Sequence, residues 1–178
     1  MDSDLIQSIE CIFQSKEKAL QVQGEKNVEY YLSEEYLKNH KLISVSEHKH
    51  LYNIISKTKC SEINGLDSFL NELGFTTVED MASGCFFYPK NGFMSWHTNH
   101  TRNDWRVYIV KSLKGDSFFR YVKDNKIITE YDPIGWSYRI FYVGNANNPY
   151  WHCVYGGSGR YSVGFRLQKN ENTLVSCQ

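Results

Sequence analysis

Residues 151–167 read WHCVYGGSGRYSVGFRL, in which two short runs of aromatic and β-branched residues flank the turn GGSG. Such runs, separated by glycine and serine, are typical of neighbouring β-strands. Because side chains alternate between the two faces of a strand, Arg160, Ser162 and Arg166 share one face of the second run. A guanidinium can bind a carboxylate through two parallel hydrogen bonds, and an adjacent hydroxyl can add a third. The stretch therefore predicts a strand pair that carries His152 and a site for a carboxylate.

The same pattern of strands and turns begins at about residue 84. The runs that read as strands are CFFY, WRVYIV, SFFRYV, KIITEY, SYRIFYV, HCVY and RYSVGFRL. Turn residues such as PKNG, KGD and DPIG separate these runs. Many short strands at close spacing predict a closed or sandwiched β fold.

The residues before position 80 are helical in pattern. We expect one helix near the N-terminus with Ser3 as its N-cap, and one surface helix in KNVEYYLSEEYLKNHK. Two more are expected over 46–57, with Leu51, Ile54 and Ile55 on one face, and over 66–73, before Gly74. The helices of residues 1–75 should cover one outer face of the β fold. We expect residues 1–178 to form a single domain, with 1–80 as a helical N-terminal support region and 84–168 as the β core.

Composition excludes several classes of protein. Twenty basic and 20 acidic residues cancel, which argues against attachment to nucleic acid or an anionic membrane by an overall positive field. The five cysteines include no Cys-x-x-Cys pair, so we expect neither a disulfide framework nor a zinc ribbon. We expect instead that the protein works in a reducing compartment. The first residues do not resemble a secretory signal, and no apolar run approaches the length of a membrane span. We therefore expect a soluble, cytoplasmic protein.

Two histidines have surroundings that suggest a metal site. His97 lies at the end of a predicted strand, Asn99 should point to the same side, and His152 lies on a strand 55 residues later. Two donors at one strand end and a third from a distant strand make one triangular face of an octahedron. Non-haem iron(II) oxygenases use this geometry and leave three positions for chemistry. Trp96 and Trp151 alternate away from these donors, so we expect them to pack outside the barrel.

Taken together, these motifs resemble the iron(II)/2-oxoglutarate-dependent oxygenases, especially their prolyl-hydroxylase-like branch, over roughly residues 84–168. FFYPKNGFMSWHTN is similar to the Tyr-Pro-…-Gly-…-His-x-Asp segment of that branch. WHCVYGGSGRYSVGFRL is similar to its His-x-Val-…-Arg-Tyr-x-(Ile/Val) segment. The resemblance implies a mainly β fold with N-terminal helices, built on a double-stranded β-helix, that is, a jelly-roll, cupin-like barrel.

The resemblance also implies roles for individual residues. His97 and His152 would bind Fe(II), and Asn99 occupies the position of the family's aspartate. An amide oxygen is a neutral and weaker donor than a carboxylate, so the departure matters chemically. Asn99 could ligate iron directly, Asp104 could reach the metal instead, the position could be open to an anion, or the fold could bind without catalysing. The first interpretation is preferred, because the rest of the motif is intact.

For the cosubstrate, the resemblance implies that Arg160 binds the distal carboxylate of 2-oxoglutarate. Tyr88 could hydrogen-bond the same group, with Ser162 as a helper. Arg166 shares a strand face with Arg160 and competes for this role. Arg160 is preferred because its Arg-Tyr context matches the family better.

The implied activity is oxidative decarboxylation of 2-oxoglutarate by Fe(II) and O₂, coupled to hydroxylation of a primary substrate. A protein side chain, a small amino-acid-like molecule and a nucleobase all remain open as that substrate, because fold does not decide substrate. Two other classes compete with this hypothesis. One is a β-barrel of the same ancestry that binds a ligand or partner without turnover, and the other is a metal-dependent cupin-like enzyme that does not use 2-oxoglutarate.

Overall fold

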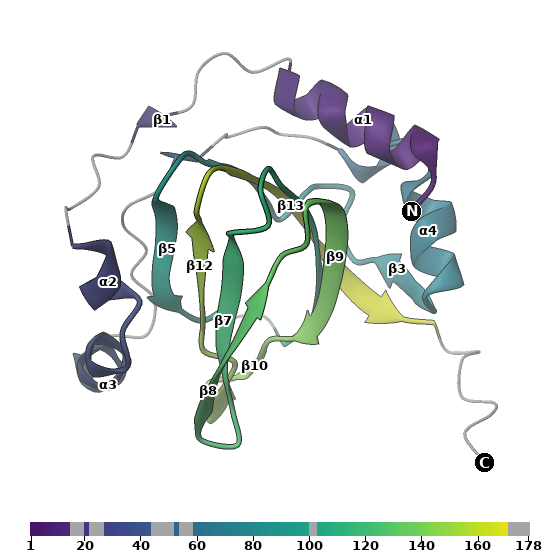
Figure 1. The fold of residues 1–178 in the computed structure, drawn as a ribbon. Coiled ribbons are helices and arrows are strands. Elements are labelled where there is room, and N and C mark those ends of the chain that lie inside the picture. The colour runs from purple at the N-terminus through teal and green to yellow at the C-terminus, as the bar shows by residue number, and fades with distance from the viewer. Residues whose placement is uncertain (15–19, 22–26, 44–51, 54–58, 100–102, 171–178) are drawn as a thin grey trace.

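The order of elements is helical first and β-rich afterwards. A computed structural model describes the chain except for residues 15–19, 22–26, 44–51, 54–58, 100–102 and 171–178 (Figure 1). Its helices are α1 (Ser3–Gln14), α2 (Val28–Tyr31), α3 (Glu34–Ile43), the 3₁₀ turn η1 (Cys60–Glu62) and α4 (Leu66–Glu72). All of them precede residue 75, and long strands follow.

Eight longer strands form two antiparallel sheets. The long strands of the first, here called the major sheet, run in the order β4 (Gly84–Tyr88), β13 (Arg160–Lys169), β6 (Trp105–Ser112) and β9 (Gly135–Tyr142). The second, the minor sheet, runs in the order β5 (Gly92–His97), β12 (His152–Gly156), β7 (Phe118–Lys123) and β8 (Lys126–Tyr131).

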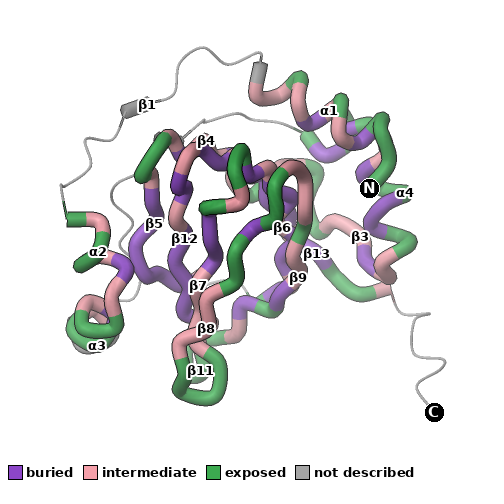
Figure 2. The backbone as a smooth tube through the Cα atoms, viewed as in Figure 1, coloured by how far each residue is buried: buried purple, intermediate pink, exposed green. Residues whose placement is uncertain are grey.

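This strand order is that of a jelly roll. From β4 onward, β4, β6, β9 and β13 lie in the major sheet, and β5, the hairpin β7–β8 and β12 lie between them along the chain, in the minor sheet. Side chains from both sheets meet in one apolar cluster between them, and its buried members are Tyr88, Met94, Phe119, Phe141, Val143 and Val154. The buried stretches of the backbone follow these facing strands (Figure 2). The predicted double-stranded β-helix is confirmed.

Several short strands complete the sheets. β1 (Leu20–Gln21), β2 (Tyr52–Asn53) and β3 (Phe75–Thr77) extend the major sheet, and β10 (Gly144–Asn145) pairs with β11 (Asn148–Pro149). The predicted helix over 46–57 is wrong at residues 52–53, which pair as a strand with β1 and β4. The apolar side chains that suggested that helix lie outside the described residues.

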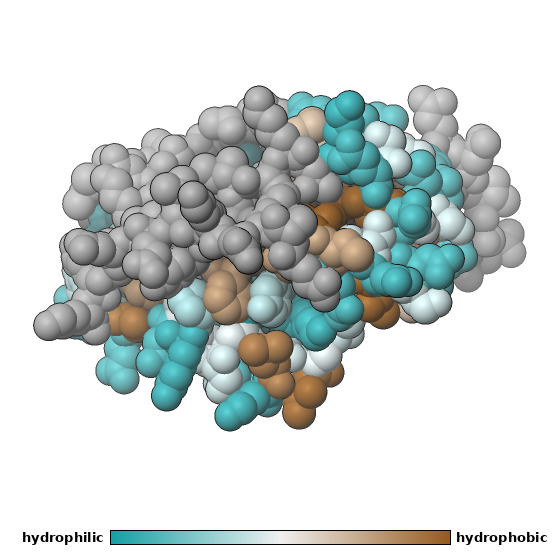
Figure 3. All heavy atoms as spheres, turned by 90° about the horizontal axis from the view of Figure 1, so that it is seen from above, coloured by the Kyte–Doolittle hydropathy of each residue, from teal (hydrophilic) through white to brown (hydrophobic). Residues whose placement is uncertain are grey.

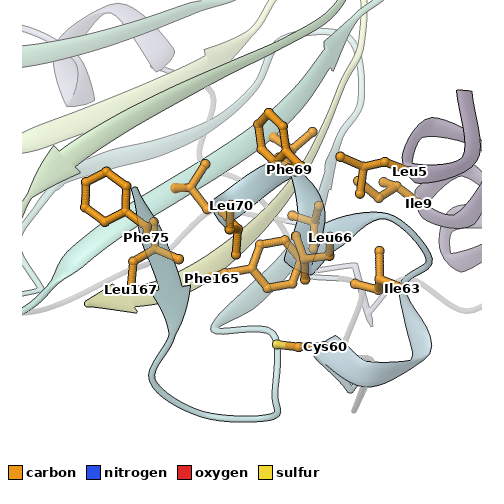
Figure 4. Close-up of a cluster of buried hydrophobic side chains, with 13 residues drawn as sticks. Leu5, Ile9, Cys60, Ile63, Leu66, Phe69, Leu70, Phe75, Phe165 and Leu167 are labelled. Carbon is orange, nitrogen blue, oxygen red and sulfur yellow. The ribbon is translucent and has the colours of Figure 1, made fainter. Parts of the chain in front are cut away.

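Helices α1 and α4 cover the outer face of the major sheet. The outward side chains Val163, Phe165 and Leu167 of β13 alternate with the inward ones and pack against both helices. Figure 4 shows Leu66 and Leu70 of α4 in this cluster, together with residues of α1 and β13. The prediction of a helix over 66–73 is confirmed, and Gly74, with φ of 79°, ends it as a left-handed residue.

Helices α2 and α3 pack against the minor sheet, on the other side of the molecule (Figure 1). The single surface helix predicted for this segment is in fact two, because Ser33 accepts a hydrogen bond from the Tyr36 backbone and begins α3. Leu32 and Leu37 are buried against Trp96. The indole of Trp96 donates to the Ser33 carbonyl at 2.9 Å. The expectation that helices cover one outer face was therefore wrong: they cover both.

Three smaller expectations concern the packing of two tryptophans, the cap of α1 and the cysteines. Trp96 and Trp151 do pack outside the barrel, in the cluster between the minor sheet and α2 and α3. The N-cap of α1 is Asp2 and not Ser3, since the Asp2 carboxylate accepts from the Leu5 backbone at 2.9 Å. No disulfide joins any two of the four described cysteines, Cys11, Cys60, Cys85 and Cys153.

The described surface mixes polar and apolar groups. Figure 3 shows the molecule from above relative to Figure 1. On the described part of that face, hydrophobic side chains form small groups between hydrophilic ones. Large apolar side chains with high exposure include Tyr131 (66%) and Ile134 (75%). Among the described helices, none has the length and apolar character needed to cross a bilayer.

The contact between α4 and the major sheet predicts a stability effect. Leu66 is fully buried in it, so Leu66→Ala should lower the free energy of unfolding by about 2–5 kcal/mol through lost contacts and a cavity. Urea denaturation followed by circular dichroism measures this change. Glu72→Ala, on the exposed side of the same helix, is the control and should change it little. Equal effects from the two variants would contradict this packing.

Candidate functional site

A small enclosed cavity lies between the two sheets. Its lining combines apolar walls with histidine, arginine and hydroxyl groups: Phe86, Tyr88, Met94, His97, Tyr108, Val154, Arg160, Ser162 and Gly164. The space open to a water-sized sphere is only about 10 Å³. A bound molecule larger than water therefore requires some of these side chains to move. Met94 is suited to such movement, because its unbranched side chain repacks readily.

His97 and His152 meet at one end of the strand pair formed by β5 and β12. They are directly opposite partners across the two strands, and their ring centroids lie 4.1 Å apart. Both are almost fully buried, at 3% and 0% exposure. The sheet register thus brings together two imidazoles that the sequence separates by 55 positions.

A β-bulge in β5 sets the direction of His97. His97 pairs with His152 and Met94 pairs with Val154, so three steps along β5 match two steps along β12. The extra residue lets Met94 and His97 both face the interior although an odd number of positions separates them. Strict alternation would have pointed one of the two outward.

Hydrogen bonds to backbone carbonyls fix the tautomer of each imidazole. His97 Nδ1 lies 2.8 Å from the Ser95 carbonyl oxygen, and His152 Nδ1 lies 3.0 Å from that of Tyr150. A carbonyl only accepts, so Nδ1 carries the proton in each neutral ring and Nε2 carries the lone pair. Histidines that bind metals usually donate their second nitrogen in this way.

Asn99 lies beside this pair. Its Nδ2 is 3.5 Å from His152 Nε2 and 3.5 Å from the Tyr108 hydroxyl oxygen. A half-turn of the amide would exchange its nitrogen and oxygen at this place. Within the described part of the chain, no group of three His, Cys, Asp or Glu side chains could hold a metal. Asn99 thus contacts both His152 and the hydroxyl of Tyr108, which lines the cavity.

The two competing candidates from the sequence are engaged elsewhere. Asp104 pairs with Arg106 at 2.9 Å and also with Arg166. Arg166 forms a second ion pair with Glu79. Neither Asp104 nor Arg166 is among the residues that line the cavity.

Arg160 lies on the cavity and is fully buried. Its Nε donates to Asp132 Oδ2 at 2.7 Å, while Nη1 and Nη2 are buried without a hydrogen bond to any described residue. Its guanidinium carbon lies 5.3 Å from the centre of the Tyr88 ring. Burial raises the pKa of the Tyr88 hydroxyl well above its usual value, an effect that the Arg160 charge partly opposes. Buried, unpartnered N–H groups are rare and point to a missing partner.

Ser162 and Tyr108 complete the polar lining. Ser162 is buried on the same face of β13 as Arg160. The Tyr108 ring occupies space that a side chain at position 164 would need, since a Cβ on Gly164 would lie 2.6 Å from it. Burial also raises the pKa of the Tyr108 hydroxyl.

Sequence reasoning missed three residues near the site. Tyr108 was included only in a strand run, and Asp132 only in the turn DPIG. The third is Arg139, which lies on β9 and forms an ion pair with Asp132. An aspartate before proline is an ordinary turn residue, so nothing in the local sequence indicated that Asp132 is 1% exposed and paired with two arginines.

Comparison with known proteins gives a limited result. No protein-family model matches the chain, and no curated protein matches it.

Solved structures match the chain only at low identity. A prolyl-4-hydroxylase of Pseudomonas putida is 13% identical, with 93% of this chain and 99% of that chain covered and a TM-score of 0.45. An oxidoreductase of the 2OG-Fe(II) oxygenase family from Burkholderia pseudomallei is 9% identical, with a TM-score of 0.40. The match covers 97% of this chain and 95% of that chain. The third is Peruvianin-I, a cysteine peptidase from Thevetia peruviana latex. It is 14% identical, with a TM-score of 0.34, and the match covers 64% of this chain and 60% of that chain. Because these similarities are weak, the fold assignment rests on the strand order described above.

The buried ion pair predicts a second stability effect. Asp132→Asn removes the charge that compensates Arg160, and breaking one partner of a buried pair typically costs about 3–5 kcal/mol. Asp124→Asn is the matched control, because Asp124 is exposed in a turn with φ of 50°, which asparagine adopts readily. The free energies of unfolding of both variants can be measured with urea. A loss in Asp132→Asn no larger than in the control would contradict the pairing.

Proposed function

We propose that this protein is an Fe(II)- and 2-oxoglutarate-dependent oxygenase that hydroxylates a primary substrate. The observation that carries the proposal is the position of Arg160. Its two unpartnered Nη groups are buried on the cavity that His97 also lines. The His97 ring contacts that of His152 at 4.1 Å between centroids, and Nε2 of each ring carries a lone pair. A molecule with a carboxylate at one end and a metal-binding group at the other would satisfy both halves of this cavity.

The described residues fit a metal ion of the iron type. Nε2 of His97, Nε2 of His152 and the amide oxygen of Asn99 would hold it, after the half-turn of the amide that presents its oxygen. The carbonyls of Ser95 and Tyr150 would keep the imidazoles in the required tautomer. When bound, Fe(II) would supply the centre at which O₂ is activated.

The overall reaction balances without another reductant. 2-Oxoglutarate, O₂ and a substrate C–H bond give succinate, CO₂ and a C–OH group, with one oxygen atom entering succinate and the other the substrate. Oxidation of the 2-oxo acid supplies two electrons, and oxidation of the substrate supplies the other two that O₂ requires. The protein's share is to orient the reactants and to exclude water.

Arg160 would hold the distal carboxylate. Its Nε is occupied by Asp132, so Nη1 and Nη2 are the groups that remain to donate. The Tyr88 hydroxyl and Ser162 line the same cavity and could add donors. Because the site is buried, these charge-assisted hydrogen bonds would be stronger than at a surface.

Asn99 would make metal and cosubstrate binding depend on each other. With three neutral ligands, both positive charges of Fe(II) remain uncompensated, whereas a carboxylate would remove one of them. The carboxylate at the metal-binding end of 2-oxoglutarate would compensate one of them, while its distal carboxylate pairs with Arg160. Metal affinity should consequently be low alone and rise strongly with the cosubstrate.

The proposal predicts a spectroscopic and a chemical result. Fe(II) and 2-oxoglutarate, added without oxygen, should produce the visible metal-to-ligand charge-transfer band, and admission of O₂ should yield succinate. Arg160→Met should lose the band at cosubstrate concentrations that saturate the unsubstituted protein. Arg166→Met should keep it, because Arg166 does not line the cavity. Absence of the band in the unsubstituted protein, with either order of addition, would refute the proposed function.

The same titration separates the rival classes. A band without succinate would favour a protein that binds the cosubstrate without turnover, or one whose turnover requires the primary substrate. Metal binding that 2-oxoglutarate leaves unchanged would favour a cupin-like metal enzyme that uses another substrate.

The neutral donor predicts a metal-affinity change. Asn99→Asp should tighten Fe(II) binding without cosubstrate by about tenfold or more, since changes outside the ligand sphere already alter affinity on this scale. The additional increase in Fe(II) affinity on adding 2-oxoglutarate should be smaller in Asn99→Asp than in the unsubstituted protein. Asn103→Asp introduces the same charge at an exposed position and is the control. Anaerobic titration measures both, and unchanged or weaker binding in Asn99→Asp would argue against ligation by position 99.

A further inference from the structure

Three charged side chains, two of them fully buried, meet at the Arg160 end of the cavity. The side chains of Asp132 and Arg160 are 0% exposed, and that of Arg139 is 14% exposed. The two oxygens of Asp132 are divided between the two arginines. Oδ2 accepts from Arg160 Nε at 2.7 Å, and Oδ1 accepts from Arg139 Nη2. One carboxylate is thus shared by two guanidinium groups from different strands of the major sheet.

This sharing decides the charge that the cavity presents. Asp132 and Arg160 alone would form a neutral pair, which attracts an anion only weakly. Arg139 adds a second positive charge, so the buried trio carries a net positive charge. Glu130 lies 3.5 Å from Arg139 Nη1, but it is 52% exposed and is screened by solvent.

The sharing also decides which donors of Arg160 remain free. An aspartate and an arginine tend to form a two-point pair, in which both oxygens accept from one guanidinium. Here Arg139 occupies Oδ1, so Asp132 takes only Nε of Arg160 and leaves Nη1 and Nη2 without a partner among the described residues. Arg139 is held in place by the Phe119 ring, 4.4 Å from its guanidinium carbon.

We propose that Arg139 is a positioning residue that gives this site its preference for a 2-oxo acid with a distal carboxylate. By occupying Oδ1 of Asp132 and neutralising its charge, Arg139 leaves the Nη groups of Arg160 to bind that carboxylate. The inference rests on the proposed function. It adds that Arg139, which does not line the cavity, determines the affinity for dicarboxylates and not for their monocarboxylate analogues.

The test compares two 2-oxo acids that share the metal-binding end. 2-Oxoglutarate has a distal carboxylate and 2-oxobutanoate has none, and each is titrated anaerobically into the Fe(II)-loaded protein while the charge-transfer band is followed. Arg139→Met should weaken binding of 2-oxoglutarate by about tenfold or more, as expected when a buried charge pair loses one member. Binding of 2-oxobutanoate to the same variant should stay within about twofold, because it makes no contact that depends on this charge.

Two further variants serve as controls. Arg139→Lys keeps the charge and one donor, so it should restore most of the affinity for 2-oxoglutarate. Glu130→Gln removes the exposed partner of Arg139 and should leave both affinities nearly unchanged. In each variant, the 2-oxobutanoate titration also tests whether the metal-binding part of the site is folded.

The outcomes separate this inference from the proposed function. Equal weakening for both acids in Arg139→Met, or no weakening of 2-oxoglutarate, would overturn the role of Arg139 while leaving the oxygenase proposal intact. No band with 2-oxoglutarate in the unsubstituted protein would overturn both.

Discussion

The buried ion pair between Arg160 and Asp132 is the constraint on which the polar half of the cavity depends. A guanidinium cannot lose its charge at ordinary pH, so its burial requires a compensating anion. Asp132 supplies that anion from the turn after β8, and its backbone N–H donates to the Ser117 carbonyl at 2.9 Å. Because Asp132 also pairs with Arg139, Arg160 is compensated without all of its donors being used. The cavity therefore presents two unpartnered donor groups of Arg160 in a buried site.

The rest of the fold holds the two halves of this cavity together. β13 carries Arg160 in the major sheet, while β5 and β12 carry the histidines in the minor sheet. The apolar cluster between the sheets fixes their separation, and the helices on both outer faces bury the opposite sides of the same strands. Each of these strands thus serves packing with one face and the site with the other, as the period of a strand allows.

Asn99 gives the site an unusual electrostatic character. Its amide is uncharged, and the buried carboxylate of Asp132 at the Arg160 end already pairs with two arginines. A dianionic ligand would therefore meet positive charge at both ends of the cavity, from the metal at one end and from the arginines at the other. This distribution favours joint binding of metal and dicarboxylate over binding of either alone.

The sequence by itself determined the fold class and the strand faces on which several cavity residues lie. Alternation placed Arg160 and Ser162 on one strand face, and turn residues marked the strand ends, because both signals act over a few neighbouring residues. Only the tertiary structure decided what depends on distant partners. It showed that residues 52–53 form a strand, that helices cover both sheets, and that a bulge directs His97 inward. It also showed that Arg166 forms an ion pair with Asp104 and that Arg139 forms one with Asp132. Long-range pairing sets each of these features, and no local pattern in the chain encodes which charges will be neighbours.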